Sequence, residues 1–150
     1  MTINSLEKMI HRKIPLTKRM GLRVKSSSVR KVEFMLPLKP NVNHVGTAFG
    51  GTILACQAVS CWGWLLNFFE ANGIEGAKVV LKSSTSAFKK PVESNFRVVC
   101  RGVGPQQQQK CRLDLLKKGR ADLKITSEAA NHAATFSGEY VILLSKKGSR

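Results

Sequence analysis

Two adjacent glycines, Gly50 and Gly51, lie where a polar segment meets a long apolar run, and this position is the one best suited to chemistry. A helix that begins here leaves its first backbone N–H groups without intrahelical partners, beside the positive end of its dipole. Glycine lets a bound group approach these N–H groups closely. They could stabilise an oxygen that gains negative charge, a contribution of roughly 3–4 kcal/mol per donor in hydrolases. The alternative is a tight turn that packs the helix on a sheet.

Neutral polar groups lie on both sides of the glycine pair. Asn43 and Thr47 precede it, and Gln57 follows it within the apolar run. An amide both donates and accepts hydrogen bonds, so Asn43 and Gln57 can orient water, although Asn43 could instead only cap a turn. His44 is either a general base, because its ordinary pKa lies near neutrality, or a loop residue. No Asp or Glu occurs between residues 52 and 69, so chemistry here depends on orientation and oxyanion stabilisation.

The cysteines do not form a metal or disulfide pattern. None of the four lies in a C-x-x-C pair, and two lie in the apolar run. We expect buried, reduced thiols and a cytoplasmic protein. Residues 1–13 lack the apolar run of a signal peptide. The sequence has no metal-ligand spacing, phosphate loop or nucleotide motif, so neither a metal nor a cofactor is expected. The cysteines are Cys56, Cys61, Cys100 and Cys111.

The apolar run predicts a long helix over residues 51–70, apolar on every face. Asn72 and Gly73 form a plausible stop, because both residue types tolerate positive φ. A helix of this kind must be buried in a protein core or in lipid. A membrane span has to be weighed, since about 18 apolar residues can cross a bilayer. Polar residues interrupt the run, and the rest of the chain has short alternating segments that need a packing surface. We therefore favour a sheet wrapped around one central helix, without a membrane span.

The segments before this helix predict one helix and the start of the sheet. Residues 5–20 have helical spacing, with Ser5 as the cap, and residues 21–24 lead into a first strand. Residues 29–38 alternate as a half-buried strand, with Val32 and Phe34 on the inner face and Glu33 on the outer face.

The segments after the long helix predict four more strands, at residues 78–88, 93–103, 123–127 and 134–144. A second helix is expected from Gln106, with Cys111, Leu115 and Leu116 facing inward. The expected fold is α+β: a single domain over residues 1–150, in which an antiparallel sheet of five or more strands wraps one helix.

The charge is unusual, because 25 Lys and Arg against 9 Asp and Glu give a net charge of +16. Such an excess favours an anionic partner, such as a phosphorylated cofactor, an acidic protein or a nucleic acid. A solvated basic surface explains it equally well, because the charges recur as scattered pairs. A nucleic-acid function is disfavoured, since the aromatic residues fall mainly at expected core positions.

The segment from Pro40 to Gly51, leading into a buried helix, resembles the hotdog-fold thioesterases. It is most similar to the thioesterase family that also occurs as the C-terminal domain behind a GNAT-type acetyltransferase. The aromatic-x-x-Pro sequence that begins at Phe88 is a supporting feature. The similarity runs from about residue 14 to residue 144.

The resemblance implies an enzyme that hydrolyses thioesters of coenzyme A or of an acidic acyl carrier protein. It implies a homodimer or tetramer in which the sheets of two subunits join edge to edge, with sites at the interface. Relatives often have a histidine at the position of Phe49 and a carboxylate at that of Ala58, and this chain has neither. A non-catalytic acyl-CoA-binding module therefore remains the alternative. By the resemblance the catalytic candidates are Asn43, Thr47, Gly50, Gly51 and Gln57, and the substrate-binding candidates are His44, Phe49, Lys82, Lys89 and Lys90.

Overall fold

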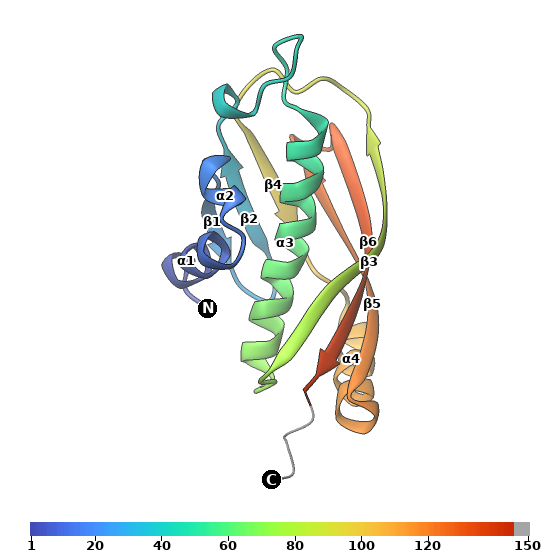
Figure 1. Cartoon of the computed structure of the whole chain (residues 1–150). Helices are drawn as coiled ribbons and strands as arrows, with labels where there is room; N and C mark the ends of the chain where they lie inside the picture. Colours follow the sequence, from blue (N-terminus) through green and yellow to red (C-terminus); the bar gives the residue numbers. More distant parts are fainter. Residues whose placement is uncertain (146–150) are drawn as a thin grey trace.

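One long helix, α3 (Gly50–Ala71), runs through the molecule and is wrapped by a six-stranded antiparallel sheet (Figure 1). This computed structural model describes residues 1–145. The sheet has the order β1-β2-β4-β5-β6-β3, so the expected α+β architecture is confirmed. The strands are β1 (Arg23–Ser27), β2 (Val32–Leu36), β3 (Ala77–Phe88), β4 (Phe96–Cys100), β5 (Arg120–Ala129) and β6 (Ala134–Leu144). The other helices are α1 (Ile3–Lys13), α2 (Leu16–Arg19) and α4 (Pro105–Lys118), with a 3-10 turn η1 (Lys39–Asn41).

The core forms around α3 because this helix has apolar side chains on every side. Trp64, Leu65 and Phe68 are at most 1% exposed, and they meet inward-facing residues of β2 and β4. By length and composition α3 could cross a membrane, but 72% of its most apolar window is buried inside this fold. The apolar surface of α3 is therefore accounted for by packing on the sheet.

The sheet is divided into two halves. β4 pairs with β5 at only two positions, through Val98 and Val99, whereas β6 pairs with β3 over the whole length of that strand. α4 packs against β5, where that strand has no partner on the β4 side. β3 is one edge of the sheet, and Val80 and Phe88 on it are 57% and 53% exposed.

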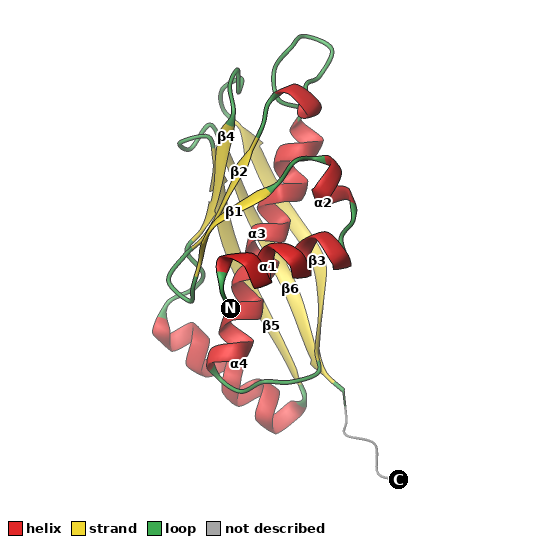
Figure 2. Cartoon of the chain, turned by 90° about the vertical axis from the view of Figure 1, so that its left-hand side faces the viewer, coloured by secondary structure: helices red, strands yellow, loops and turns green. Residues whose placement is uncertain are grey.

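The N-terminal helices flank α3 on the β1 side of the sheet (Figure 2). Residues Leu6 and Ile10 of α1 are fully buried. Thr2 caps α1, because its hydroxyl oxygen accepts from the N–H of Ser5, so the expectation that Ser5 is the cap was wrong.

Three other expectations were wrong. The strand expected over residues 29–38 begins only at Val32, since Val29 lies in the turn after the separate strand β1. Glu33 is 7% exposed rather than on an open face. Its carboxylate accepts from Lys31 Nζ at 2.7 Å and from an Arg97 nitrogen at 2.9 Å. Leu116 is 66% exposed, although Cys111 and Leu115 face inward as expected.

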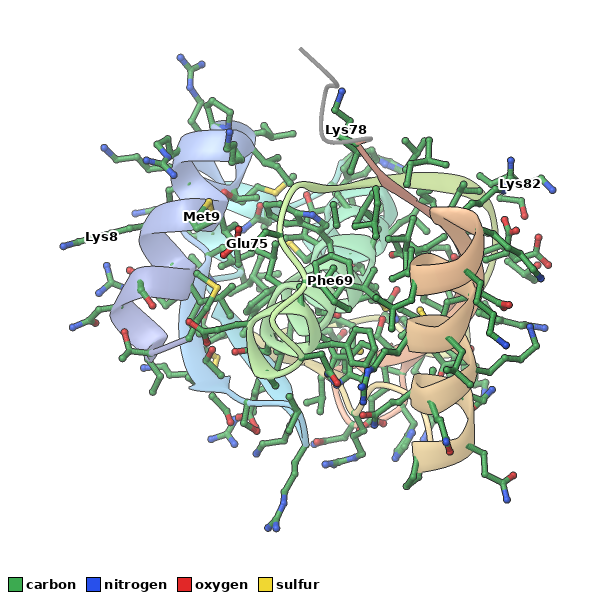
Figure 3. All side chains as sticks on the ribbon, turned by 90° about the horizontal axis from the view of Figure 1, so that it is seen from below. Lys8, Met9, Phe69, Glu75, Lys78 and Lys82 are labelled. Carbon is green, nitrogen blue, oxygen red and sulfur yellow. The ribbon has the colours of Figure 1, made fainter. Side chains whose placement is uncertain are left out.

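The basic side chains surround the molecule. Figure 3, seen from below, shows Lys8 projecting from α1 on one side and Lys82 projecting from β3 on the opposite side. The charge is therefore dispersed over the surface, as the scattered pairs in the sequence indicated.

Candidate functional site

The N-terminus of α3 presents free backbone donors, as the glycine pair predicted. Phe49 is the N-cap and supplies no side-chain hydrogen bond, and the first helical bond joins Ile53 N–H to the Phe49 carbonyl at 3.1 Å. Within residues 1–145, the N–H groups of Gly50, Gly51 and Thr52 have no acceptor. Three donors beside the positive end of a 22-residue helix can stabilise a negatively charged oxygen.

Two half-exposed aromatic rings flank these donors. Phe49 is 55% exposed and Phe88 is 53% exposed. The ring of Phe49 packs so closely on Gly51 that a Cβ atom there would overlap it, and a Cβ at Gly50 would lie 3.5 Å from the ring of Phe88. Glycine is thus needed at position 51, whereas a Cβ at position 50 would make only an ordinary contact. Phe88 was not among the predicted site residues, and its sequence signal was the aromatic-x-x-Pro segment.

The loop before α3 holds Asn43 and Thr47 together. Asn43 Nδ2 donates to Thr47 Oγ1 at 2.8 Å, and Asn43 Oδ1 accepts the N–H groups of Val45 and Thr47 at 3.0 and 3.1 Å. These are the bonds of a capped turn. An amide nitrogen has two N–H groups, so one donor of Asn43 remains for water or a carbonyl oxygen. His44 is exposed in the same loop.

Asn41 fixes this loop to the body of the protein. Its side chain is 4% exposed, and Nδ2 donates to the carbonyls of Met20 and Pro37, each at 2.8 Å. Its own carbonyl accepts Phe49 N–H at 2.7 Å. One residue therefore positions α2, η1 and the start of α3 relative to one another. No local sequence pattern marks Asn41 for this role, because its bond to Met20 is formed only in the tertiary fold.

Gln57 lies inside the protein, two turns along α3. Its side chain is fully buried, and Nε2 donates to the carbonyl of Ala134 at 3.2 Å. Ser127 Oγ donates to the Gln57 carbonyl at 3.1 Å. Gln57 Oε1 has no partner within the described residues, which leaves a buried acceptor uncompensated. Gln57 is seven positions after Gly50, so its side chain begins about 10 Å along the helix axis from the first of the free donors.

The predicted substrate-binding lysines separate into two groups. Lys89 and Lys90 follow Phe88 directly and are exposed, and the N–H of Lys89 donates to the Ala133 carbonyl at 2.7 Å. Lys82 interrupts the β3–β6 register in the middle of the strand. Phe88 is six positions further along the extended strand than Lys82, a distance of roughly 20 Å. The fold therefore brings Lys89 and Lys90 to the candidate site and leaves Lys82 distant from it within one chain.

The hydroxyl residues of β3, Ser83 to Ser86, alternate between the faces of the sheet. Ser86 pairs in register with the buried Phe136, which places it on the inner face together with Phe88. Its Oγ is buried without a partner in the described part of the chain. Ser84 lies on the same face by this alternation, and Ser86 is the nearer of the two to Phe88 along the strand.

The four thiols are confirmed as free and buried, and three of them are unsuited to nucleophilic chemistry. Burial raises the pKa of Cys56 to about 12 and that of Cys111 to about 11. A hydrogen bond with Cys61, together with burial, raises the pKa of Cys100. Because the thiolate is the reactive form, these three thiols are inert near neutral pH.

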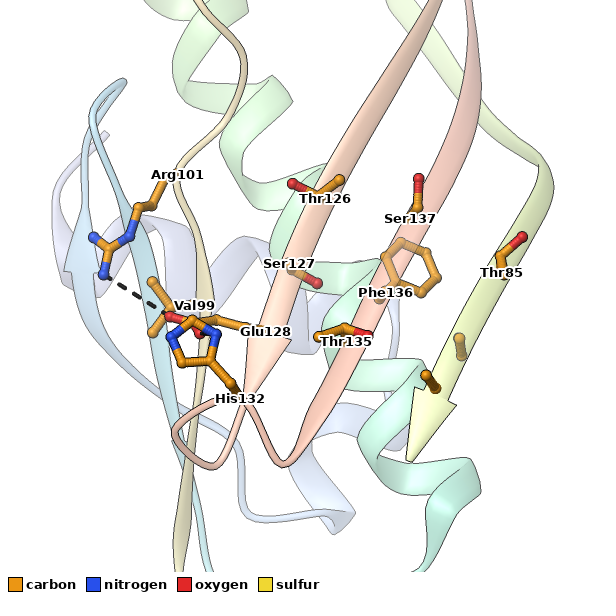
Figure 4. A pocket seen from close by; sticks show the side chains of 12 residues that line it. Thr85, Val99, Arg101, Thr126, Ser127, Glu128, His132, Thr135, Phe136 and Ser137 are labelled. Atoms are coloured by element: carbon orange, nitrogen blue, oxygen red, sulfur yellow. Dashed lines mark ion pairs between the residues drawn. The ribbon is translucent and has the colours of Figure 1, made fainter. Parts of the chain in front are cut away.

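A cavity of ≈ 510 Å³ lies away from the start of α3, against β5, β6 and the end of β3 (Figure 4). Thr85, Thr126 and Ser137 line it, and Glu128 pairs at its edge with His132 and, at 3.9 Å, with Arg101. Thr126 and Glu128 alternate with the inward-facing residues of β5, so this cavity faces away from α3. It shares no lining residue with the donors at the start of α3.

Comparison with known proteins gives this arrangement a context. The sequence model of a family described as "Putative thioesterase (yiiD_Cterm)" matches residues 3–144. A protein of unknown function from Chlorobaculum tepidum is similar in structure, with TM-score 0.89 and 22% identity, over 95% of this chain and 94% of that chain. A putative thioesterase from Shewanella oneidensis has TM-score 0.81 and 24% identity, over 95% and 97% of the two chains. A probable thioesterase from Pseudomonas aeruginosa, PA5026, has TM-score 0.78 and 20% identity, over 95% and 96%. These likenesses show the hotdog fold.

Proposed function

Because the chain belongs to the family described as "Putative thioesterase (yiiD_Cterm)", we propose that it hydrolyses acyl thioesters at the N-terminus of α3. The observation that carries the proposal is the set of three free N–H groups, on Gly50, Gly51 and Thr52, between two half-exposed aromatic rings. A thioester carbonyl oxygen placed there would receive hydrogen bonds that strengthen as negative charge develops on it.

The proposed reaction uses water as the nucleophile. The water oxygen bonds to the thioester carbon, the carbon–sulfur bond breaks, and the products are a carboxylic acid and a thiol. Asn43 has a free N–H, and Thr47 lies 2.8 Å from the same amide nitrogen, so this pair is proposed to hold the water or the carbonyl oxygen. Gln57 is proposed as a positioning residue, because its amide ties α3 to β6. No strong base belongs to this set, so we expect a low kcat.

The substrate proposed is an acyl thioester of coenzyme A or of an acyl carrier protein, in the cytoplasm. Both carriers are anionic, and Lys89 and Lys90 are exposed immediately after Phe88. Exposed charges act over about a Debye length, roughly 10 Å at 0.1 M salt. Raising the salt concentration should therefore raise KM with little change in kcat, and Lys89→Glu with Lys90→Glu should do the same. A nucleic-acid ligand would instead give salt-dependent binding to oligonucleotides that coenzyme A fails to displace.

We also propose a homodimer joined along β3, with a tetramer as its extension. The edge of β3 has backbone groups without partners in the described chain, and Val80, Leu81 and Phe88 on it are exposed by 39% or more. A long exposed edge of this kind is a template for pairing with another strand. Sedimentation that shows only monomer at the concentrations of the assay would contradict this proposal.

The test of function is hydrolysis across a series of acyl-CoA lengths, with release of free thiol as the measurement. Wild type should turn over, and Asn43→Ala should lower kcat by about 100-fold, the typical cost of one orienting or oxyanion donor. Gln57→Ala should lower kcat as well, while both variants remain folded by circular dichroism. Full activity in both variants would show that the site is misplaced.

The second candidate is a non-catalytic acyl-CoA-binding module. It is favoured by the absence of any Asp or Glu between residues 52 and 69, because the resemblance to hotdog thioesterases implies a carboxylate about two turns into this helix. Tight binding of acyl-CoA without turnover at any chain length would select this function.

A further inference from the structure

A groove opens beside the free donors, between α2 and the first two turns of α3. It has a volume of ≈ 390 Å³, and its lining includes Leu16 and Met20 on one wall and Phe49 and Ala55 on the other. Leu16 and Phe49 are each 55% exposed. Exposed apolar groups that line a concave surface are typical of a binding site.

The groove is continuous with the proposed reaction site. Gly51 and Thr52 line it, and their N–H groups are two of the three free donors. A carbonyl oxygen held by these donors would leave one substituent of the carbonyl carbon at the mouth of the groove. The other substituent would extend past Phe88, which contacts Gly50 on the opposite side, towards Lys89 and Lys90.

The surfaces on the two sides of the carbonyl position, the groove and the region beyond Phe88, differ in charge. Beyond Phe88 lie two exposed lysines, which suit an anionic carrier. The lining of the groove is mainly apolar, and Arg19 is its charged residue. Because apolar surface favours an apolar occupant, the acyl chain fits the groove and the carrier fits the lysine side.

The groove is held open by bonds beneath it. Asn41 Nδ2 donates to the Met20 carbonyl at 2.8 Å, and Thr17 Oγ1, on a side chain that is 2% exposed, donates to the Ile14 carbonyl at 2.7 Å. The sulfur atoms of Cys56 and Met20 lie 3.8 Å apart. A cleft formed before binding loses less conformational entropy when its ligand enters.

We propose that this groove binds the acyl chain of the thioester, and that Leu16, Met20 and Ala55 set the preferred chain length. The inference rests on the proposed function, since it takes the free donors as the position of the carbonyl group. It assigns a role to α2, which the proposed chemistry does not otherwise use.

The experiment measures binding rather than turnover, so that it remains informative if hydrolysis fails. S-alkyl-CoA thioethers, which lack the reactive carbonyl, are titrated calorimetrically from ethyl to hexadecyl. In wild type, Kd should fall about fourfold for each methylene that enters the groove, and then level off. Ala55→Leu should reach this plateau with a chain about two to three methylenes shorter, because leucine adds three carbons to the wall.

Two further variants keep the test falsifiable. Leu16→Ala removes an exposed side chain of α2, so it should preserve folding and weaken the binding of long thioethers several-fold, leaving coenzyme A itself unaffected. Leu116→Ala, at an exposed leucine of α4, is the matched control and should change nothing.

The outcomes separate the two proposals. A plateau that shifts to shorter chains in Ala55→Leu supports binding of the acyl chain in the groove. If wild type then fails to hydrolyse any acyl-CoA, only the proposed hydrolysis is contradicted. A plateau that is unchanged in Ala55→Leu and Leu16→Ala overturns the inference, whatever the hydrolysis assay shows. Thioethers that bind no more tightly than coenzyme A also overturn it.

Discussion

Gly51→Ala is the substitution that tests the site most directly, because the structure separates its effect on activity from its effect on stability. A Cβ at this position would overlap the ring of Phe49, which must then move. The ring is 55% exposed, and full burial of a phenylalanine stabilises by about 1.5–3 kcal/mol, so displacing it costs roughly 1 kcal/mol. Alanine regains up to about 1 kcal/mol in helix propensity. The free energy of unfolding should therefore change by less than about 1 kcal/mol.

The effect on turnover should be much larger. The added methyl group and the displaced ring obstruct the approach to the N–H groups of Gly51 and Thr52, and loss of one oxyanion donor lowers kcat by about 100- to 1000-fold. The assay is release of free thiol from acyl-CoA, with urea denaturation on the same samples. Gly63→Ala is the matched control, because Gly63 lies in the same helix far from its N-terminus and its Cβ would meet Val32 at an ordinary contact distance of 3.5 Å. If Gly51→Ala keeps full activity, or if both variants lose it equally, the reasoning is refuted.

Three further predictions concern stability and reactivity. Gly102→Ala should lower the free energy of unfolding by about 2–4 kcal/mol in urea denaturation, since its Cβ would overlap the ring of Trp64. Gly119 has a similar positive φ but open space around it, so Gly119→Ala should lower the free energy of unfolding by only about 1–2 kcal/mol. The Lys31 hydrogen bond holds the pKa of Glu33 below its ordinary value. The ionised Glu33 carboxylate therefore stabilises the fold by about 1–3 kcal/mol above roughly pH 4.3, and this stabilisation is lost as the pH falls through the lowered pKa. The difference in the free energy of unfolding between wild type and Glu33→Gln should shrink from about pH 6 to about pH 3. A difference that stays constant would contradict this assignment. The buried thiols should resist a disulfide reagent at neutral pH and all react in denaturant, and rapid labelling of the native protein would show that the core opens readily.

Much of the fold could be predicted because one feature of the sequence limits the alternatives. The apolar run gave α3 to within one residue at each end, since a helix without a polar face has to be surrounded. The last strand, 134–144, was also placed correctly from its alternation. A strand was expected to begin near residue 24, but β1 was not separated from the strand over residues 29–38, because its sequence, RVKSS, has a single buried apolar residue, Val24. Glu33 was assigned to an open face because one of its two basic partners, Arg97, is brought to it only by the pairing of β2 with β4.

The site was only partly predictable for a related reason. Gly50 and Gly51 could be found locally, because a glycine pair before an apolar run marks a helix N-terminus. Phe88 and Asn41 contribute through contacts with distant parts of the chain, which no spacing rule reveals. Lys82 was grouped with Lys89 as a substrate-binding candidate, but the length of β3 keeps it away from the site within one chain.

Phe88 connects the proposed site to the proposed dimer. It is the last residue of β3, the edge strand, and its ring lies beside Gly50 while remaining 53% exposed. A second copy that pairs along β3 would cover this ring and close one side of the donor site, so an isolated protomer should be a poor enzyme. Activity per protomer should therefore fall on dilution through the dimer dissociation constant, and Val80→Lys, which places a charge on the exposed edge, should shift this fall to higher concentrations. Sedimentation at matched concentrations identifies the species present. Constant activity per protomer, down to concentrations at which only monomer sediments, would show that the site is complete within one chain.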